Sequence, residues 1–570
     1  MPEKKKGGGI STVLSHEFSL MRSALSNEDD MRNNLNEIRS RDEPVYIDAR
    51  KAKNDNELLA EIGYKPELKR KFSTLEVFGV SFSIMGLLPS ISSILAMCLE
   101  GGTVCLVWGW FVSSFFILLI GVAMAELGSA VPTSGGLYYW TYLFSPEKIK
   151  IELSFLIGNT NTVALTAALC AVDYGIASAV LATASIGSNN SFEITNAMIF
   201  AVTVLTIITH IIGSCIASGF IARLQSFAIF ANMTLILIFI ISLPAGTDNR
   251  NDAEFIFGNL DNMTTWPIGW VFFLNGWMGS VWSIGAFDSC VHMSEEAKDS
   301  ARSVPIGIIG SISACWILGF VIMIVIAACI NPDISSVVES DLGLPMAQLI
   351  YDCLGKKWAI AIMSIIIFCQ WLIGVSILTA ASRQIWAFSR DNGLIFSKYI
   401  KVVSKSISVP IRAVIFGGIL SIIMSTLVLI GSVAANALFS LFIAANYIAW
   451  GTPFFLRMVN GKGKFHPGPF YLGKILSPIV NWTAILFICF IVVMVMFPAN
   501  KEVDKETMNY TVVITCATWI LSAAYYYIYA RKVYFGPRKT IGDDDVGEAI
   551  NIDDILQKND VHVSVESVST

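Results

Sequence analysis

Residues Phe78–Pro89 read FGVSFSIMGLLP and lie inside a longer apolar segment, Phe72–Leu99. That segment is long enough to cross a bilayer as a helix, but Gly79, Gly86 and Pro89 weaken the helix near its middle. An unwound stretch leaves backbone N–H and C=O groups unpaired, and a bound polar substrate can satisfy them in lipid. The half-helix after the break would point its positive dipole end at the gap, which suits a carboxylate. A packing glycine followed by a proline kink is the alternative interpretation, since both residues are common in membrane helices.

A second apolar segment is interrupted in a similar way. Residues Asn275–Asp288 read NGWMGSVWSIGAFD, with glycines and small polar residues among the apolar ones. The tripeptides FSI at Phe82–Ile84 and WSI at Trp282–Ile284 are alike. The two segments are the first and sixth apolar runs of the chain. Broken spans five apart are what an inverted repeat of five plus five helices would give.

The composition requires lipid as the solvent for much of the chain. Hydrophobic residues make up 54% of the 570 residues and charged residues 15%, whereas a soluble protein carries about 25% charged residues. We therefore predict an all-α polytopic membrane protein with about twelve transmembrane helices. The predicted spans are Phe72–Leu99, Val104–Leu127, Ile149–Ala184, Asn196–Ala217, Leu224–Leu243, Trp266–Val291, Pro305–Cys329, Trp358–Phe388, Pro410–Ile430, Ala435–Arg457, Ile475–Pro498 and Tyr510–Ala530.

These spans divide the chain into a core and flanking parts. The predicted parts are an N-terminal tail at residues 1–71, a ten-helix core at 72–457 with repeats at 72–243 and 266–457, two accessory helices at 475–530, and a C-terminal tail at 531–570. The N-terminal tail is polar and is expected to be disordered, with room for one short helix.

Loop charges predict the orientation. If both termini are cytoplasmic, most basic loop residues lie inside, as the positive-inside rule requires. The basic residues left outside are Arg250, Lys356, Lys357, Lys501 and Lys505.

Several function classes lack their sequence signals. A net charge of -5 from evenly mixed residues does not favour nucleic acid as a partner. No GxxxxGK[ST] loop is present, so an ATP-driven pump is not expected, and no catalytic triad suggests an enzyme. The eleven cysteines form no CxxC pair and the five histidines are scattered, so we expect no metal or other cofactor. A secondary transporter fits, while a channel and a non-transporting sensor stay open.

Carboxylates inside membrane spans are costly and usually functional. Asp173 falls in the third span, Asp288 in the sixth and Glu126 at the inner end of the second. A structural or gating role is expected for Glu126 and Asp288. For Asp173, binding a substrate ammonium, carrying a proton and locking helices together all stay open. Arg383, near the end of the eighth span, is expected to snorkel to the interface.

Four motifs carry a resemblance to a known family. They are AELGSAVPTSGGLYYW at Ala125–Trp140, DSCVHMSEEAKDSARSVP at Asp288–Pro305, SRQIWAFSRDNGL at Ser382–Leu394 and PGPFYLGK at Pro467–Lys474. Together they resemble the amino acid–polyamine–organocation (APC) superfamily. The last motif, with Gln370 and the RDNGL run, is similar to its fungal amino acid/choline transporter branch, and within that branch to the GABA-specific permeases.

The resemblance implies a LeuT-type fold in which the two broken spans hold the substrate. The positions that match the first-span segment for the substrate carboxylate are Ser83, Ile84, Met85 and Gly86. Those that match the sixth-span segment, whose carbonyls face the substrate amine, are Ser283, Ile284, Gly285 and Ala286. Trp282 matches an aromatic gate, with a core or lipid-interface tryptophan as the alternative. Asn232 stands where some relatives carry a lysine linked to proton coupling, so the proton path of this chain is left open.

We therefore expect a secondary transporter that imports 4-aminobutanoate (GABA) or a closely related amino compound by alternating access. The family resemblance also implies that this transport is coupled to protons. A choline, polyamine or broader amino-acid permease is the alternative, and a nutrient sensor is the alternative of another class. The plasma membrane is the expected location, with the vacuolar membrane as the alternative. Lys4, Lys5 and Lys6 could serve ubiquitin-driven sorting, although a solvated charge run explains them as well.

Overall fold

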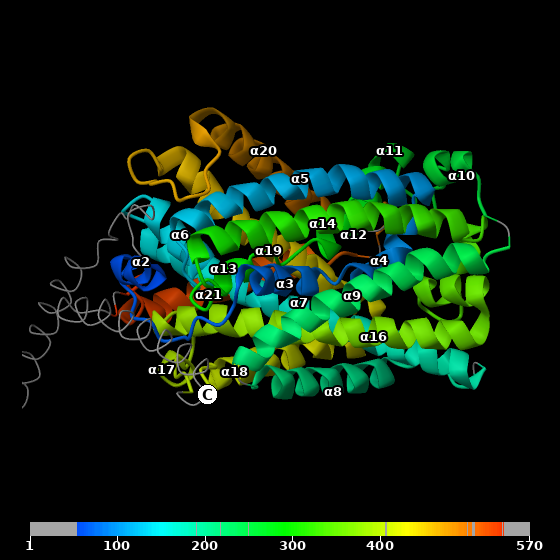
Figure 1. Ribbon diagram of the computed structural model, residues 1–570, viewed down its shortest axis with the longest axis horizontal. Coiled ribbons are helices and arrows are strands. Elements are labelled where there is room, and N and C mark those ends of the chain that lie inside the picture. The colour runs from blue at the N-terminus through cyan, green and yellow to red at the C-terminus, as the bar shows by residue number, and fades with distance from the viewer. Residues whose placement is uncertain are drawn as a thin grey trace, which may run out of the picture. The chain divides into compact units, whose positions relative to one another are not determined.

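The computed structural model describes residues 54–540, apart from residues 190, 217, 249, 405–406, 499, 504–507 and 539. In this part of the chain, eleven helical segments are long and apolar enough to cross a membrane. One of them, Thr74–Leu99, consists of two helices, α3 (Thr74–Met85) and α4 (Leu87–Leu99). The other ten are α5 (Gly102–Ala130), α7 (Lys150–Ser188), α8 (Asn196–Ser214), α9 (Ser218–Gly246), α14 (Ser300–Cys329), α16 (Pro345–Arg390), α18 (Ile411–Ser425), α19 (Ser432–Asn460), α20 (Gly473–Met494) and α21 (Thr511–Ile528) (Figure 1). The predicted all-α polytopic fold is confirmed.

The predicted sixth span is present as a chain of short pieces. They are α11 (Ile268–Val271), the π-helical turn η1 (Phe272–Gly276), α12 (Met278–Ser283) and α13 (Ser289–His292). No single piece has the length of a membrane helix. The predicted sixth span is therefore not among the eleven continuous spans of the described residues, although about twelve spans are expected from the sequence.

The break in the first span falls at Gly86, as the sequence predicts. Gly86 has φ 37° and ψ 62°, the left-handed region in which side chains with a Cβ are strained. A Cβ at this position would lie 2.0 Å from Cδ1 of Ile373 on α16, so the close approach of α16 also requires glycine. The Ser90 hydroxyl donates to the Met85 carbonyl at 2.7 Å, and this bond satisfies a group that the break sets free.

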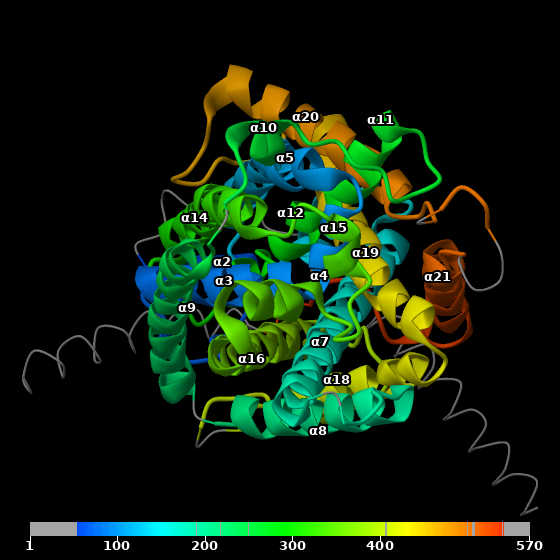
Figure 2. The same ribbon diagram turned by 90° about the vertical axis from the view of Figure 1, so that its right-hand side faces the viewer.

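The broken spans lie in the middle of the helix bundle. Viewed end-on, α3, α4 and α12 are surrounded by α5, α7, α14, α16 and α19, while α8, α20 and α21 lie at the outside (Figure 2). The predicted accessory helices α20 and α21 pack on α19, and also on α5 and α7 respectively. The division into two repeats stays a prediction.

From residue 54 onward the N-terminal tail contains the one short helix for which the sequence leaves room. The short helix α2 (Asp55–Ile62) forms, and Leu59 and Tyr64 are buried against the bundle. The sequence did not locate this helix, because two helical turns are too short to give a clear hydrophobic periodicity within a polar segment. The structure adds four further short helices, α6 (Gly136–Phe144), α10 (Ala253–Gly258), α15 (Ile334–Val338) and α17 (Ser397–Ile400). Lys4, Lys5 and Lys6 lie outside the described residues.

Candidate functional site

The two broken spans meet at a small cavity of about 20 Å³, which we call the central cavity. It is lined by residues from the first span, α7, the sixth span, α16 and α19. These residues are Ile84, Ser90, Ala168, Val172, Trp282, Ser283, Gly285, Ala286, Ile377 and Phe442. The cavity thus brings Ile84 together with four positions of the sixth span, 282, 283, 285 and 286, all of which the family resemblance assigns to the site or its gate.

The sixth span is unwound beside this cavity. Helix α12 ends at Ser283, and Ile284 has φ -94° and ψ 55°, outside helical geometry. Ala286 has φ 54°, in the left-handed region that is uncommon for a residue with a Cβ. The Ile284 N–H still donates to Ser280, and the carbonyls from Ala286 to Asp288 accept from N–H groups that follow them in the chain. The carbonyls of Ile284 and Gly285 have no backbone donor among the described residues, and a polar ligand can use such groups.

Of the first-span residues assigned to the site, Ile84 lines the central cavity and the others do not. The Ser83 hydroxyl lies 3.1 Å from that of Ser376, and Ser376 donates to Oε1 of Gln225 at 3.0 Å. Ser83 thus contacts α16, and it does not line the central cavity; Met85 is buried without lining it either. Helix α4 begins at Leu87, so its first N–H groups have no acceptor within the helix and face the break.

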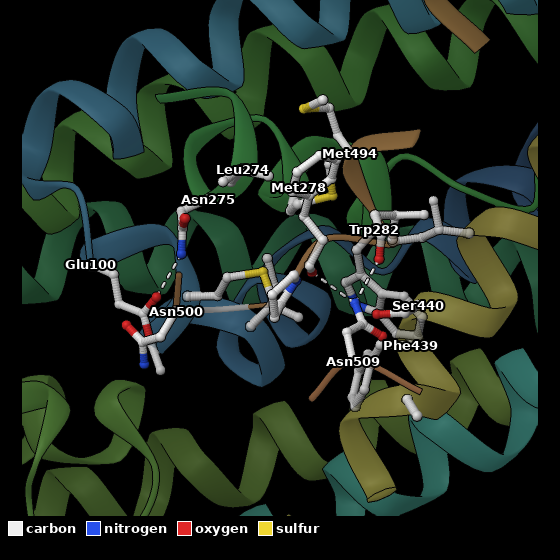
Figure 3. A pocket seen from close by; sticks show the side chains of 18 of the residues that line it. Glu100, Leu274, Asn275, Met278, Trp282, Phe439, Ser440, Met494, Asn500 and Asn509 are labelled. Carbon is white, nitrogen blue, oxygen red and sulfur yellow. Dashed lines mark hydrogen bonds between the residues drawn. The ribbon is translucent and has the colours of Figure 1, made fainter. Parts of the chain in front are cut away.

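Trp282 separates the central cavity from a larger one of about 350 Å³, which we call the wide cavity, because its side chain lines both. The indole packs edge-on against Phe439 and Phe442, at ring-centroid distances of 4.4 and 5.2 Å. Figure 3 shows Trp282 and Phe439 side by side at one end of the wide cavity, with Glu100 and Asn275 toward the other. This position fits the predicted gate.

Asp173 lies beside the central cavity without lining it, although its neighbour Val172 does. Its Oδ1 is 2.9 Å from Nδ1 of His210 on α8, and both side chains are fully buried. The ring of His210 packs on Trp371 at 5.6 Å between centroids. A Cβ on Gly374 would lie 2.2 Å from Cε1 of His210, so a glycine on α16 makes room for the imidazole.

Glu126 holds three helices together. Its carboxylate accepts hydrogen bonds from Arg457 on α19 at 2.7 Å, and from Ser477 and Asn481 on α20 at 2.7 and 3.2 Å. It also accepts from the backbone N–H of Leu472 at 3.0 Å. A buried charge with this many donors is well satisfied, and the arrangement favours the structural role.

Asp288 joins the sixth span to α7. Its Oδ2 accepts from Nδ2 of Asn161 at 3.1 Å and lies 3.4 Å from Nε2 of His292. Asn161 in turn donates to Asn446 on α19 at 3.3 Å. These contacts connect three of the helices that surround the central cavity.

Two buried ion pairs lie at the end of the bundle where α2 packs. Arg383 is fully buried and donates to Glu296 at 2.7 Å, so the prediction that it snorkels to the interface is wrong. The paired acid compensates a charge that would otherwise need water. Arg390 donates to Glu295 at 3.0 Å and stacks 3.8 Å over the ring of Tyr64. Burial opposes ionisation of Glu295, but Arg390 outweighs it and lowers the pKa of that carboxyl.

Comparison with known proteins identifies the family of this chain. A family model for amino acid permeases matches residues 72–518. The chain belongs to the amino acid permease family. The GABA-specific permease of Saccharomyces cerevisiae is 53% identical over 97% of each chain. Two uncharacterized amino-acid permeases of Schizosaccharomyces pombe are 35% and 32% identical, over 88% and 87% of this chain and 92% and 90% of theirs. The permease is therefore a multi-pass membrane protein that transports amino compounds, and the predicted resemblance is confirmed.

The structure adds residues to the candidate site of the permease that the sequence did not single out. His210 is the partner of Asp173; a histidine inside an apolar span was its only signal, and the sequence separation of the two hides the contact. Glu100 comes directly after the first span. A charged residue just outside a span is no signal of function in the sequence, but Glu100 lines the wide cavity. Asn232 donates to the Ala228 carbonyl at 2.9 Å, so this position carries a neutral amide within α9.

Proposed function

We propose that this permease imports GABA or a closely related amino compound by alternating access. The observation that carries the proposal is the meeting of the two broken spans at the central cavity, beside the gate residue Trp282. The 53% identity to a GABA-specific permease supports the choice of substrate.

GABA carries a carboxylate and an ammonium separated by three methylenes. We assign the carboxylate to the first N–H groups of α4 next to Gly86, where the helix dipole is positive. The ammonium is assigned to the unwound sixth-span carbonyls from Ser283 to Ala286, and the methylenes to the apolar lining. Ile84, Ile377 and Phe442 supply that lining.

The central cavity has room for about one water molecule. A GABA molecule needs more space than that, so binding requires the broken spans to move apart. Trp282 is placed to move with them, because it belongs to the sixth span and lines the cavities on both sides.

With both termini in the cytoplasm, the wide cavity faces outward and the Glu296–Arg383 and Glu295–Arg390 pairs close the inner end. Opening inward then requires these buried pairs to separate as the first and sixth spans rock against the surrounding helices. We place the permease in the plasma membrane, as expected for uptake. Lys4, Lys5 and Lys6 are the candidate sites for ubiquitin-driven sorting.

Proton coupling is assigned to the Asp173–His210 pair. The neutral Asn232 cannot take up a proton in the pH range of the cell, whereas a buried carboxylate and imidazole in contact can share and release one. The pair sits on α7 next to Val172 of the central cavity, so its charge can respond to what occupies the cavity.

Uptake of radiolabelled GABA in cells that lack their own permeases tests the proposal. We expect saturable uptake with trans-stimulation, which separates a carrier from a channel and from a non-transporting sensor. Unlabelled choline, putrescine and proline should compete weakly. Uptake no higher than in vector controls, with the protein at the cell surface, would exclude GABA, and strong competition by choline or putrescine would favour a cation carrier.

A further inference from the structure

The lining of the wide cavity includes a carboxylate that does not line the central cavity. Most of its lining is apolar, including Ile94, Met278 and Phe439, and Glu100 is its acidic member. Glu100 stands at the C-terminal end of α4, and its Oε2 accepts a hydrogen bond from Nδ2 of Asn275 at 2.5 Å (Figure 3). Figure 3 shows this pair at one end of the cavity and Trp282 toward the other.

Asn275 holds the carboxylate in place. It belongs to the π-helical turn η1 of the sixth span, and its side chain is only 4% exposed. A π-helical turn inside a membrane span is uncommon and often found at functional sites. The amide donor fixes one carboxylate oxygen and leaves the charge itself uncompensated.

The surroundings of Glu100 favour a cation. Among the ion pairs that the described residues form, none includes Glu100. The carboxylate also stands at the negative end of the α4 dipole, beside the last-turn residues Ala96 and Met97 that line the same cavity. A carboxylate and a helix C-terminus together repel anions and attract an ammonium group.

We propose that the wide cavity is a preliminary binding site for the primary ammonium group of the substrate, with Glu100 as its counter-ion. The site captures the amino compound before Trp282 opens the way to the central cavity. The cavity volume of about 350 Å³ is within the range of small-molecule sites, and its apolar walls suit a short methylene chain. This inference rests on the proposed transport of an amino compound.

Glu100→Gln tests the site, because glutamine keeps the size and removes the charge. At pH 8 we expect the KM for GABA uptake to rise about tenfold, the size of one partly buried charge interaction, with a maximal rate within about twofold of the wild type at the same pH. Glu254→Gln is the matched control: Glu254 is exposed on α10, and its KM should not change. Glu100→Asp keeps the charge and should raise KM by less than threefold.

An amine without a carboxylate probes the same charge directly. n-Butylamine should inhibit GABA uptake by the wild type and the Glu254→Gln variant, and the Glu100→Gln variant should need about tenfold more of it. Surface biotinylation confirms that each variant is present. Unchanged KM and unchanged n-butylamine inhibition in Glu100→Gln at pH 8 would overturn the site. So would a KM in Glu100→Asp that rises as far as in Glu100→Gln. Absence of GABA uptake by the wild type would instead refute the proposed function.

Discussion

Oδ1 of Asp173 lies 2.9 Å from Nδ1 of His210, and neither side chain is accessible to solvent. The pair joins α7, which borders the central cavity, to the peripheral helix α8. Because the carboxylate points to His210, the arrangement favours a proton or helix-locking role for Asp173 over direct contact with a substrate ammonium.

Asp173→Asn separates the proton role from the locking role. If the pair carries the proton, the variant should lose GABA accumulation driven by a pH gradient while equilibrium exchange of labelled for unlabelled GABA persists at a reduced rate. Asp341→Asn, in an exposed loop, removes one carboxylate elsewhere and should keep both activities. Loss of exchange together with a marked loss of thermal stability would instead assign the pair a structural role.

Gly86→Ala tests the break in the first span. Alanine at φ 37° is strained by about 1–2 kcal/mol, and its Cβ would overlap Ile373. We expect GABA uptake to fall more than tenfold at equal surface abundance. Gly258→Ala, at a glycine with nothing within 4 Å of a Cβ, is the control. Normal uptake by Gly86→Ala would show that the break needs no glycine.

Glu296→Gln tests the closure at the α2 end of the bundle. Removing one partner of the buried pair leaves Arg383 uncompensated, which costs about 3–5 kcal/mol. The purified full-length variant should therefore unfold at a clearly lower temperature than the wild type in the same detergent. The exposed substitution Glu254→Gln should leave the transition in place. Equal transitions for all three proteins would contradict the role of this pair.

The pH dependence of uptake tests Glu100. Burial raises the pKa of its carboxyl from 4.5 to about 7, and the hydrogen bond from Asn275 offsets this only in part. The carboxylate that attracts an ammonium is therefore present above pH 7 and is lost as pH falls below 7. The ratio of KM in Glu100→Gln to KM in the wild type should be largest at pH 8 and approach one near pH 5.5. A ratio that does not change with pH would contradict this titration.

Among the described residues, few other charged groups affect the titration of Glu100. The titratable side chains next to Glu100 on its own helix and on α5 are the thiols of Cys98 and Cys105. From the neighbouring loops, Asp261 and Lys501 are exposed, so salt and water screen them. Repeating the measurement at high salt should leave the pH dependence of the ratio in place.

The sequence was sufficient to predict the spans and both breaks, because apolar runs of membrane length and the glycines that interrupt them are local signals. The contacts between distant helices were not accessible in this way. Nothing near Asp173 indicates that His210 is its partner, and nothing near Arg383 indicates Glu296. The assignment of Arg383 to the interface failed for that reason: an arginine near a span end snorkels by default unless a buried acid from another span compensates it.

The positions carried over from the family resemblance were placed unevenly by the structure. Ile84 and the sixth-span residues line the central cavity, whereas Ser83 contacts Ser376 and Met85 packs in the core. Resemblance gives the segment that forms a site, but the side of a short helix that faces the substrate depends on how neighbouring helices pack.

Counterflow in liposomes tests the central proposal most directly. The purified full-length permease is reconstituted, the vesicles are loaded with unlabelled GABA, and labelled GABA is added outside. We expect labelled GABA to accumulate transiently inside the vesicles, and its initial rate of entry to be more than tenfold lower with the Gly86→Ala variant. No overshoot in wild-type vesicles, with the protein shown to be folded and inserted, would contradict GABA transport through the broken spans.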